Sequence, residues 1–141
     1  MINDGFKMKG RLSIAINNEV VQEVDNLVVT AGKNLVASRL KDTTDGAMSH
    51  MAVGTGTTAA AAGDTALGTE ADRQALTSTT VTNNEVAYVA TFGAGDGTGA
   101  ITEAGLFNAS SAGTMLCRTV FSVVNKAADD SMTITWTVTV S

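Results

Sequence analysis

A glycine-rich stretch near the middle of the chain, MAVGTGTTAAAAGDTALGTEADR at residues 51–73, has the residue types of a phosphate-binding loop. Such loops hold phosphate with backbone N–H groups, and a Walker A loop also needs Lys directly after its last Gly. Here Gly54-x-Gly56 is followed by Thr57 and Thr58, and the dinucleotide fingerprint fails at its third glycine. We therefore predict no nucleotide site. The small residues are expected instead to let one chain segment pass close to another.

His50 is the only histidine in the sequence and the first candidate for acid–base chemistry. On a strand, its neighbours Ser49 and Met51 point to the opposite face, and the sequence indicates no partners that would complete a triad. We interpret His50 as a strand histidine that is hydrogen-bonded or exposed. One His and one Cys separated by most of the domain also lack the spacing of a metal site.

Cys117 is the only cysteine and cannot form a disulfide within the chain. It shares a strand face with Met115 and Phe121, which predicts a small buried hydrophobic residue rather than a nucleophile. The neighbouring Arg118 lies on the other face. We expect it either at an interface or with its guanidinium extended into solvent.

The acidic residues are candidates for cation binding, but none is arranged like a calcium loop, whose oxygen ligands alternate around a glycine. They fall in two groups: Asp64, Glu70 and Asp72, and the turn residues Asp96, Asp129 and Asp130. We expect Asp64 to cap a turn or helical start at residues 65–67. Glu70 is expected to pair with Arg73 at the surface, where an ion pair contributes little. No catalytic, cofactor-binding or metal-binding residue and no cofactor are predicted, and the chain is predicted not to be an enzyme.

Composition narrows the possible partners. The 141 residues carry a formal net charge of −5, with 44% hydrophobic and 4% aromatic residues. The absence of a basic cluster and the few aromatic side chains argue against direct nucleic-acid binding. No apolar run approaches the length of a membrane span, and the first residues lack the pattern of a signal peptide. We expect no membrane partner and synthesis in the cytoplasm.

The elements that position these residues are predicted to be short strands separated by turns. Residues 132–140 alternate strictly between larger apolar side chains and threonines, so one face is expected in the core and the other against water or a polar partner. Asn17-Asn18 and Asn83-Asn84 favour tight turns. No proline removes a backbone donor. Seven or eight such strands predict an antiparallel sandwich or barrel.

One short helix is expected near residues 31–41, with Thr30 as its N-cap. Its apolar stripe would consist of Leu35, Val36, Ala37 and Leu40. No linker divides the chain, so we predict a single domain over residues 1–141. Residues 1–25 of that domain would form an N-terminal hairpin or an extension.

Several blocks taken together resemble the cement, or head-decoration, proteins of tailed bacteriophages, with similarity also to phage tail-fibre and collar proteins. The resemblance covers roughly residues 26–141. The blocks are NLVVTAGKNLVASRL, SHMAVGTGTTAAAAGDTALGTEADR, ATF, GAITEAGLFNA, GTMLCRTVFSVV and SMTITWTVTV.

This resemblance implies an all-β fold, a jelly-roll-like β-sandwich that forms homodimers or homotrimers. It implies a non-enzymatic virion protein that binds the capsid exterior and clamps neighbouring subunits of the major capsid protein, or alternatively a structural protein of the tail. The group has no catalytic motif, so no active-site residues transfer to this chain. We expect the helix near residues 31–41 and the N-terminal hairpin to contribute to the interfaces.

Overall fold

The alternating C-terminal segment forms strand β10 (Met132–Val140) at the centre of a five-stranded antiparallel sheet, here called sheet A. The structure, a computed structural model, describes residues 5–41 and 45–141. The strand order in sheet A is β2-β1-β10-β7-β6. The other four strands are β1 (Met8–Ile16), β2 (Glu19–Asp25), β7 (Glu85–Phe92) and β6 (Ser78–Thr82).

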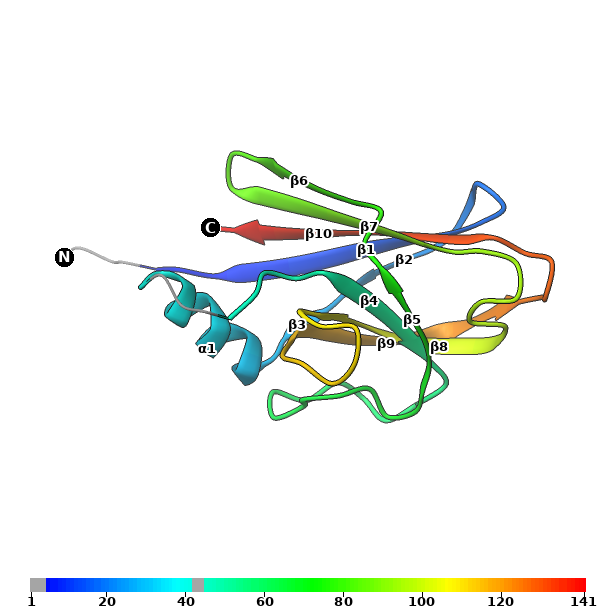
Figure 1. Ribbon diagram of the computed structural model, residues 1–141, viewed down its shortest axis with the longest axis horizontal. Helices are drawn as coiled ribbons and strands as arrows, with labels where there is room; N and C mark the ends of the chain where they lie inside the picture. The colour runs from blue at the N-terminus through cyan, green and yellow to red at the C-terminus, as the bar shows by residue number, and fades with distance from the viewer. Residues whose placement is uncertain (1–4, 42–44) are drawn as a thin grey trace.

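A second five-stranded antiparallel sheet, sheet B, packs against sheet A (Figure 1). Its strand order is β3-β9-β8-β4-β5. The strands are β3 (Leu27–Val28), β9 (Met115–Lys126), β8 (Gly99–Phe107), β4 (His50–Gly54) and β5 (Glu70–Ala75). The predicted antiparallel sandwich with one short helix is thus confirmed. The N-terminal hairpin is part of sheet A, because β1 lies between β2 and β10.

The core lies between the two sheets and contains the apolar half of β10. Met132, Ile134 and Trp136 are completely buried, as the alternation predicts. The intervening threonines lie on the outer face of sheet A and are half-buried, because β1 and β7 flank them on both sides. Both predicted asparagine turns form as well, with positive φ at Asn17, Asn18 and Asn83.

The chain first crosses from sheet A to sheet B between β2 and β3, and this crossing consists of a single residue, Asn26. The Asn26 side-chain oxygen accepts a hydrogen bond of 3.1 Å from the buried Trp136 Nε1, and its backbone N–H donates to the Gly10 carbonyl. A Cβ atom at Gly10 would overlap the Asn26 side chain, so glycine is required beside this crossing. The contact joins the corner of the sandwich to the centre of its core.

Helix α1 (Thr30–Arg39) packs on β9 at one end of the sandwich (Figure 1). Its N-cap is Val29, not the predicted Thr30, because Val29 keeps the extended backbone of the preceding strand (φ −78°, ψ 162°). The predicted apolar stripe is also partly wrong. Leu35 is buried, but Ala37 is exposed and Leu40 is 88% exposed, since the helix ends at Arg39 and rests on Gly32 and Leu35.

Two strands were not predicted. β3 has only two residues, too few to show any alternation. β5 has the sequence EADRQA and no buried residue, because it lies at the edge of sheet B and pairs only with β4. A polar edge strand lacks the apolar period on which strand prediction depends.

Candidate functional site

The glycine-rich segment forms the loop at residues 55–69 between β4 and β5, and this loop encloses the carboxylate of Glu103 on β8. The backbone N–H groups of Gly56 and Thr69 donate to Glu103 Oε2, each at 2.7 Å. The Gly68 N–H donates to Glu103 Oε1, also at 2.7 Å. The loop therefore does bind an anion with its amides, and the anion is a side chain of the same protein.

Glycine is needed in this loop because the backbone approaches the carboxylate closely. A Cβ atom at Gly56 would overlap the Glu103 carboxylate, and one at Gly54 would overlap the Thr69 carbonyl oxygen. Gly68 has no such overlap, but its Cβ would lie 3.4 Å from the Cα atom of Gly56. The prediction that small residues let chain segments pass close together is confirmed for this loop.

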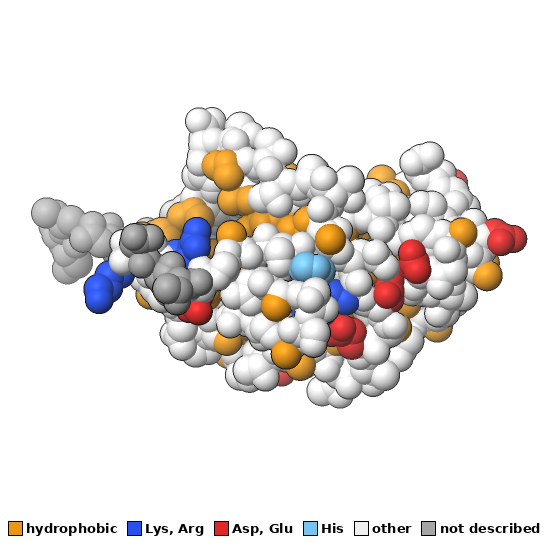
Figure 2. Space-filling view, in the orientation of Figure 1, with side chains coloured by type: hydrophobic (Ala, Val, Ile, Leu, Met, Phe, Trp, Pro, Cys, Tyr) orange, Lys and Arg blue, Asp and Glu red, His pale blue; other side chains and the backbone are white. Residues whose placement is uncertain are grey.

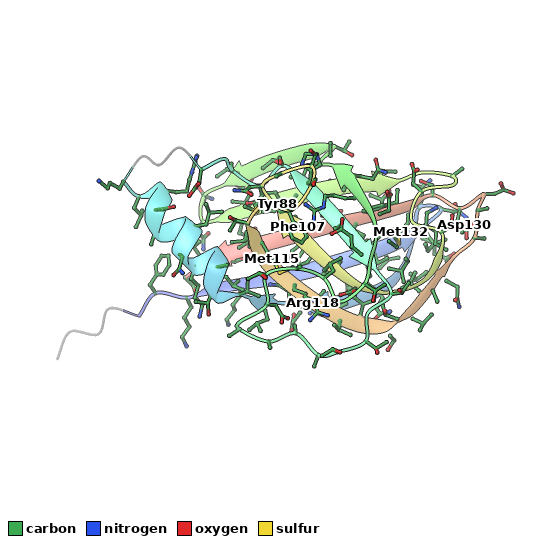
Figure 3. All side chains as sticks on the ribbon, turned by 60° about the horizontal axis from the view of Figure 1, so that its bottom comes forward. Tyr88, Phe107, Met115, Arg118, Asp130 and Met132 are labelled. Atoms are coloured by element: carbon green, nitrogen blue, oxygen red, sulfur yellow. The ribbon has the colours of Figure 1, made fainter. Side chains whose placement is uncertain are left out.

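Arg118 on β9, labelled in Figure 3, completes the enclosure of Glu103 through hydrogen bonds to its carboxylate. Its Nη2 and Nε atoms lie 3.0 and 3.2 Å from Glu103 Oε1, and Nη2 also donates to the Thr58 carbonyl. The Arg118 side chain is 3% exposed and that of Glu103 is 0% exposed. The prediction that Arg118 lies at an interface or extends into solvent is wrong, because the loop at residues 55–69 covers this face of sheet B.

Asp64 connects Arg118 to the loop. Its Oδ2 atom lies 2.8 Å from Arg118 Nη1 and accepts a second hydrogen bond from the Ala61 N–H. The Asp64 N–H in turn donates to the Ala61 carbonyl. Asp64 thus closes the turn that precedes it, and the predicted cap at residues 65–67 is wrong, because the carboxylate points back toward Arg118.

Electrostatics keep both acids of this network ionised. Burial alone raises the pKa of Glu103, but hydrogen bonds from the three loop amides and from Arg118 outweigh it, so the pKa lies below its ordinary value. The hydrogen bond from the Ala61 N–H lowers the pKa of Asp64 most; burial opposes it, and the hydrogen bond and charge of Arg118 lower the pKa further, so that it lies below its ordinary value. We call Glu103, Arg118, Asp64 and the loop at residues 55–69 the carboxylate clamp.

The clamp uses its charged groups for internal contacts. The Glu103 carboxylate accepts three hydrogen bonds from loop amides and two from Arg118, and no lone pair faces solvent because the side chain is fully buried. Such a carboxylate is suited to fixing a loop rather than to exchanging a proton with a substrate. Glu103 is not among the residues predicted from the sequence. A lone Glu among the apolar residues of GAITEAGLF is the signal that could have found it.

The predicted ion pair between Glu70 and Arg73 is confirmed, with Arg73 Nη2 2.7 Å from Glu70 Oε1. The expected surface setting is wrong for the arginine, whose side chain is only 8% exposed. Its guanidinium lies 3.8 Å from the centroid of the Phe107 ring, and Nη1 donates to the carbonyls of Ala109 and Ala112. Arg73 therefore fastens the edge strand β5 to the turn after β8.

His50 and Cys117 take the structural roles predicted for them. His50 Nδ1 and Ser49 Oγ are hydrogen-bonded at 2.7 Å, so the expectation that Ser49 points to the face opposite His50 is wrong; Ser49 lies just before β4, which begins at His50. Cys117 is completely buried in the core between the sheets. Burial raises the pKa of its thiol well above the ordinary value, so the thiol stays protonated.

Among residues 5–41 and 45–141, no three His, Cys, Asp or Glu side chains lie close enough together to hold a metal ion. The helix found in this part of the chain is too short and too polar to cross a membrane. An open hollow of about 750 Å³ lies over β1 and β10. Its lining includes Thr135, Thr137, Thr139 and Arg11, and Arg11 forms an ion pair of 2.9 Å with Asp25.

Comparisons with protein-family models, curated proteins and solved structures find no match to this chain. The geometry carrying most weight is the carboxylate clamp, together with the hydroxyl-rich outer face of sheet A.

Proposed function

We propose that this chain is a non-enzymatic structural protein of a tailed bacteriophage. It binds the exterior of the capsid and stabilises the head by clamping neighbouring subunits of the major capsid protein. The observation that carries the proposal is the carboxylate clamp, in which the buried charged side chains of Glu103 and Arg118 brace the fold. The resemblance of residues 26–141 to head-decoration proteins supplies the biological setting.

A braced sandwich suits this mechanical role. Opening the loop at residues 55–69 would expose Glu103 and Arg118 together, because the backbone of the loop is hydrogen-bonded to both side chains. Removing one partner of a buried ion pair is costly, so the loop and the two strands are expected to separate only as a unit. A protein that holds capsid subunits against internal pressure needs slow opening of this kind, and it needs interface area rather than chemistry.

The outer face of sheet A is the surface that we assign to the capsid. Thr133, Thr135, Thr137 and Thr139 form a row of hydroxyls along β10, and Thr133 Oγ1 lies 3.1 Å from Thr91 Oγ1 on β7. Threonine is short and stiff at χ1, so it loses little conformational freedom when a partner covers it. The row is uncharged and can hydrogen-bond as donor or acceptor with a polar protein surface.

Imaging of particles from the phage that encodes this chain tests the location directly. If the protein cements the capsid, its copies should be spread over the head, and the number of copies should be similar to the number of symmetry-related sites on the capsid. A ring of about a dozen copies at the tail would replace the proposal by the alternative tail role. Heads that lack the protein should also lose their contents at a lower temperature than complete heads, and equal heat resistance would contradict cementing.

The contact face is tested by binding of purified protein to heads that lack it. Thr135→Lys places a bulky charge in the centre of the threonine row and should abolish binding while leaving the unfolding midpoint unchanged. Thr57→Lys is the matched control, because Thr57 is exposed on the loop over sheet B. If both variants bind like the parent chain, the outer face of sheet A is not the contact.

A further inference from the structure

Strand β6 forms one edge of sheet A and carries none of the usual protection of an edge strand. Its sequence is STTVT, and all five residues are exposed. It pairs with β7 on one side, and no strand in the described part of the chain pairs with its other side. Edge strands are normally shielded by charges, proline or a covering segment, because their unpaired N–H and C=O groups attract another strand. β6 has neither charge nor proline.

The other sheet edges differ from β6 in ways that discourage pairing. β2 contains Glu19, Glu23 and Asp25, and its Gln22 side chain pairs with the backbone N–H and C=O of Ser122 on β9. β5 contains Glu70 and Asp72. β3 has two residues. β6 is thus the one uncharged edge of useful length among the described strands.

We propose that β6 pairs antiparallel with β6 of a second copy of this chain, about a two-fold axis at Thr80. Charge selects a second copy as the occupant. Each chain carries a formal net charge of −5, so two copies repel wherever acidic strands meet. An edge that attracted an oppositely charged protein would carry charge itself. An uncharged edge is the place where identical acidic chains can meet without bringing like charges together.

The sequence of β6 is self-complementary in this register. Thr80 lies opposite its counterpart in the second copy, Thr79 opposite Val81, and Ser78 opposite Thr82. Thr–Thr pairs and pairs of β-branched residues are favourable across strands. Because the two-fold axis is perpendicular to the sheet, pairing joins two copies of sheet A into one continuous ten-stranded sheet. The hydroxyl faces of both copies then lie on the same side.

Pairing also covers apolar surface. Val81 is 69% exposed, and its side chain lies on the core-facing side of sheet A. Figure 2 shows hydrophobic side chains gathered between β6 and β4, where sheet B does not extend under the edge of sheet A. Leu76 and Tyr88 lie partly buried against the core in this part of the molecule. In the dimer, the Thr79 side chain of the second copy covers Val81.

The inference deepens the proposed function by naming how copies join, and it rests on that function only for its biological purpose. A five-residue edge is small beside the roughly 800 Å² per partner of a stable interface. We therefore expect a dimer that dissociates on dilution and becomes permanent only where a surface holds two copies side by side. A chain that stays monomeric at all concentrations would overturn the β6 pairing. It would not contradict capsid binding, which is tested separately by binding of the protein to heads that lack it.

Sedimentation of the full chain between about 1 μM and about 1 mM provides the test. The parent chain should double in mass as concentration rises. Thr80→Lys puts two positive charges opposite each other on the two-fold axis, and Thr80→Glu puts two negative charges there, so each variant alone should remain monomeric. An equimolar mixture of the two should regain the dimer, because opposite charges then face each other. Val20→Lys on the exposed part of the β2 edge is the matched control and should dimerise like the parent.

Cross-linking gives a second readout at the same position. Directly opposed residues of an antiparallel pair have Cα atoms close enough for a disulfide. Thr80→Cys should therefore form a covalent dimer under mild oxidation, while Val20→Cys should not, and the buried Cys117 does not compete. A parent chain that is monomeric throughout, a trimeric mass, or a mixture of the Lys and Glu variants that fails to associate would each overturn the proposal.

Discussion

The carboxylate of Glu103 and the guanidinium of Arg118 face each other from neighbouring strands with no solvent between them, Oε1 lying 3.0 Å from Nη2. Three amides of a glycine-rich loop bind the same carboxylate from the opposite side. A motif type associated with phosphate binding here encloses a residue of its own chain. The loop is thereby held to sheet B by charge-assisted hydrogen bonds rather than by apolar packing.

Arg118→Met should destabilise the fold strongly, because it leaves Glu103 buried without its counter-charge. The expected loss is about 3–5 kcal/mol in the free energy of unfolding, measured by urea denaturation. Arg11→Met is the matched control, since Arg11 pairs with Asp25 at the surface and its side chain is 58% exposed. Its expected loss is at most about 1 kcal/mol. Equal losses in the two variants would show that the buried pair is not special.

Stability should fall in acid because of the clamp. An unfolded Glu titrates near pH 4.3 and an unfolded Asp near 3.9, whereas the pKa values of Glu103 and Asp64 are lowered in the folded chain. Between the two values the unfolded chain binds more protons, so acid favours unfolding. The contribution is fully present above about pH 5 and is lost as the pH falls through the lowered folded pKa values.

Urea midpoints measured at intervals from about pH 6 to about pH 3 check this expectation. The amide of Glu103→Gln does not titrate, so the acid-dependent fall should be shallower in that variant than in the parent chain. Asp130→Asn is a useful comparison, because the pKa of Asp130 is also lowered but its carboxylate lies outside the clamp, at the turn before β10. An unchanged pH profile in Glu103→Gln would contradict the ionised state assigned to the clamp.

Gly56→Ala should disturb the clamp without adding or removing any charge. The new methyl group would overlap the Glu103 carboxylate, and the loop would have to move away, at an expected cost of about 1–3 kcal/mol. Gly63→Ala in the same loop meets no atom within 4 Å, and its φ is not positive. That control should leave stability unchanged or raise it by up to about 1 kcal/mol. Similar effects at both positions would mean that backbone freedom, not close approach, selects glycine here.

Gly32→Ala in helix α1 separates helix propensity from packing. Alanine is favoured over glycine inside a helix by about 1 kcal/mol, but a methyl group at residue 32 would overlap the backbone of Leu116 on β9. We expect a net loss of stability, measured by thermal denaturation. Asn34→Ala is the control, because Asn34 is exposed on the same helix and should gain from the propensity alone. A rise in both variants would show that the helix tolerates displacement from β9.

The sandwich was predictable because its central strands carry their pattern locally. A few consecutive residues are enough to indicate the strand period in the alternation that ends at Val140. The same holds for the turn type at the asparagine pairs 17–18 and 83–84. The burial of Cys117 could be predicted equally well, since its apolar neighbours share its strand face. Edge strand β5 has no such pattern, because its sequence EADRQA contains no alternation of apolar and polar residues.

The clamp was not predictable in the same way. Glu103 and Arg118 are brought together by the register of β8 with β9, while Asp64 and the loop amides come from a segment more than thirty residues away in the sequence. No spacing of residues within one segment of the sequence indicates that these groups lie close together in the fold. The sequence predicted that the small residues of the glycine-rich loop let chain segments pass close together, yet the reason for its glycines became visible only with the position of the Glu103 carboxylate.

The first and last strands of the described chain lie side by side, and this has a topological consequence. Lys7 and Ser141 exchange two backbone hydrogen bonds, at 2.6 and 2.8 Å, at one end of sheet A (Figure 1). A short linker could therefore join these residues and turn the chain into a ring. New ends could then be opened at the exposed Asn17-Asn18 turn, since circular permutants succeed at such turns. We therefore expect a permuted chain to fold, provided that the order of the strands in each sheet is preserved.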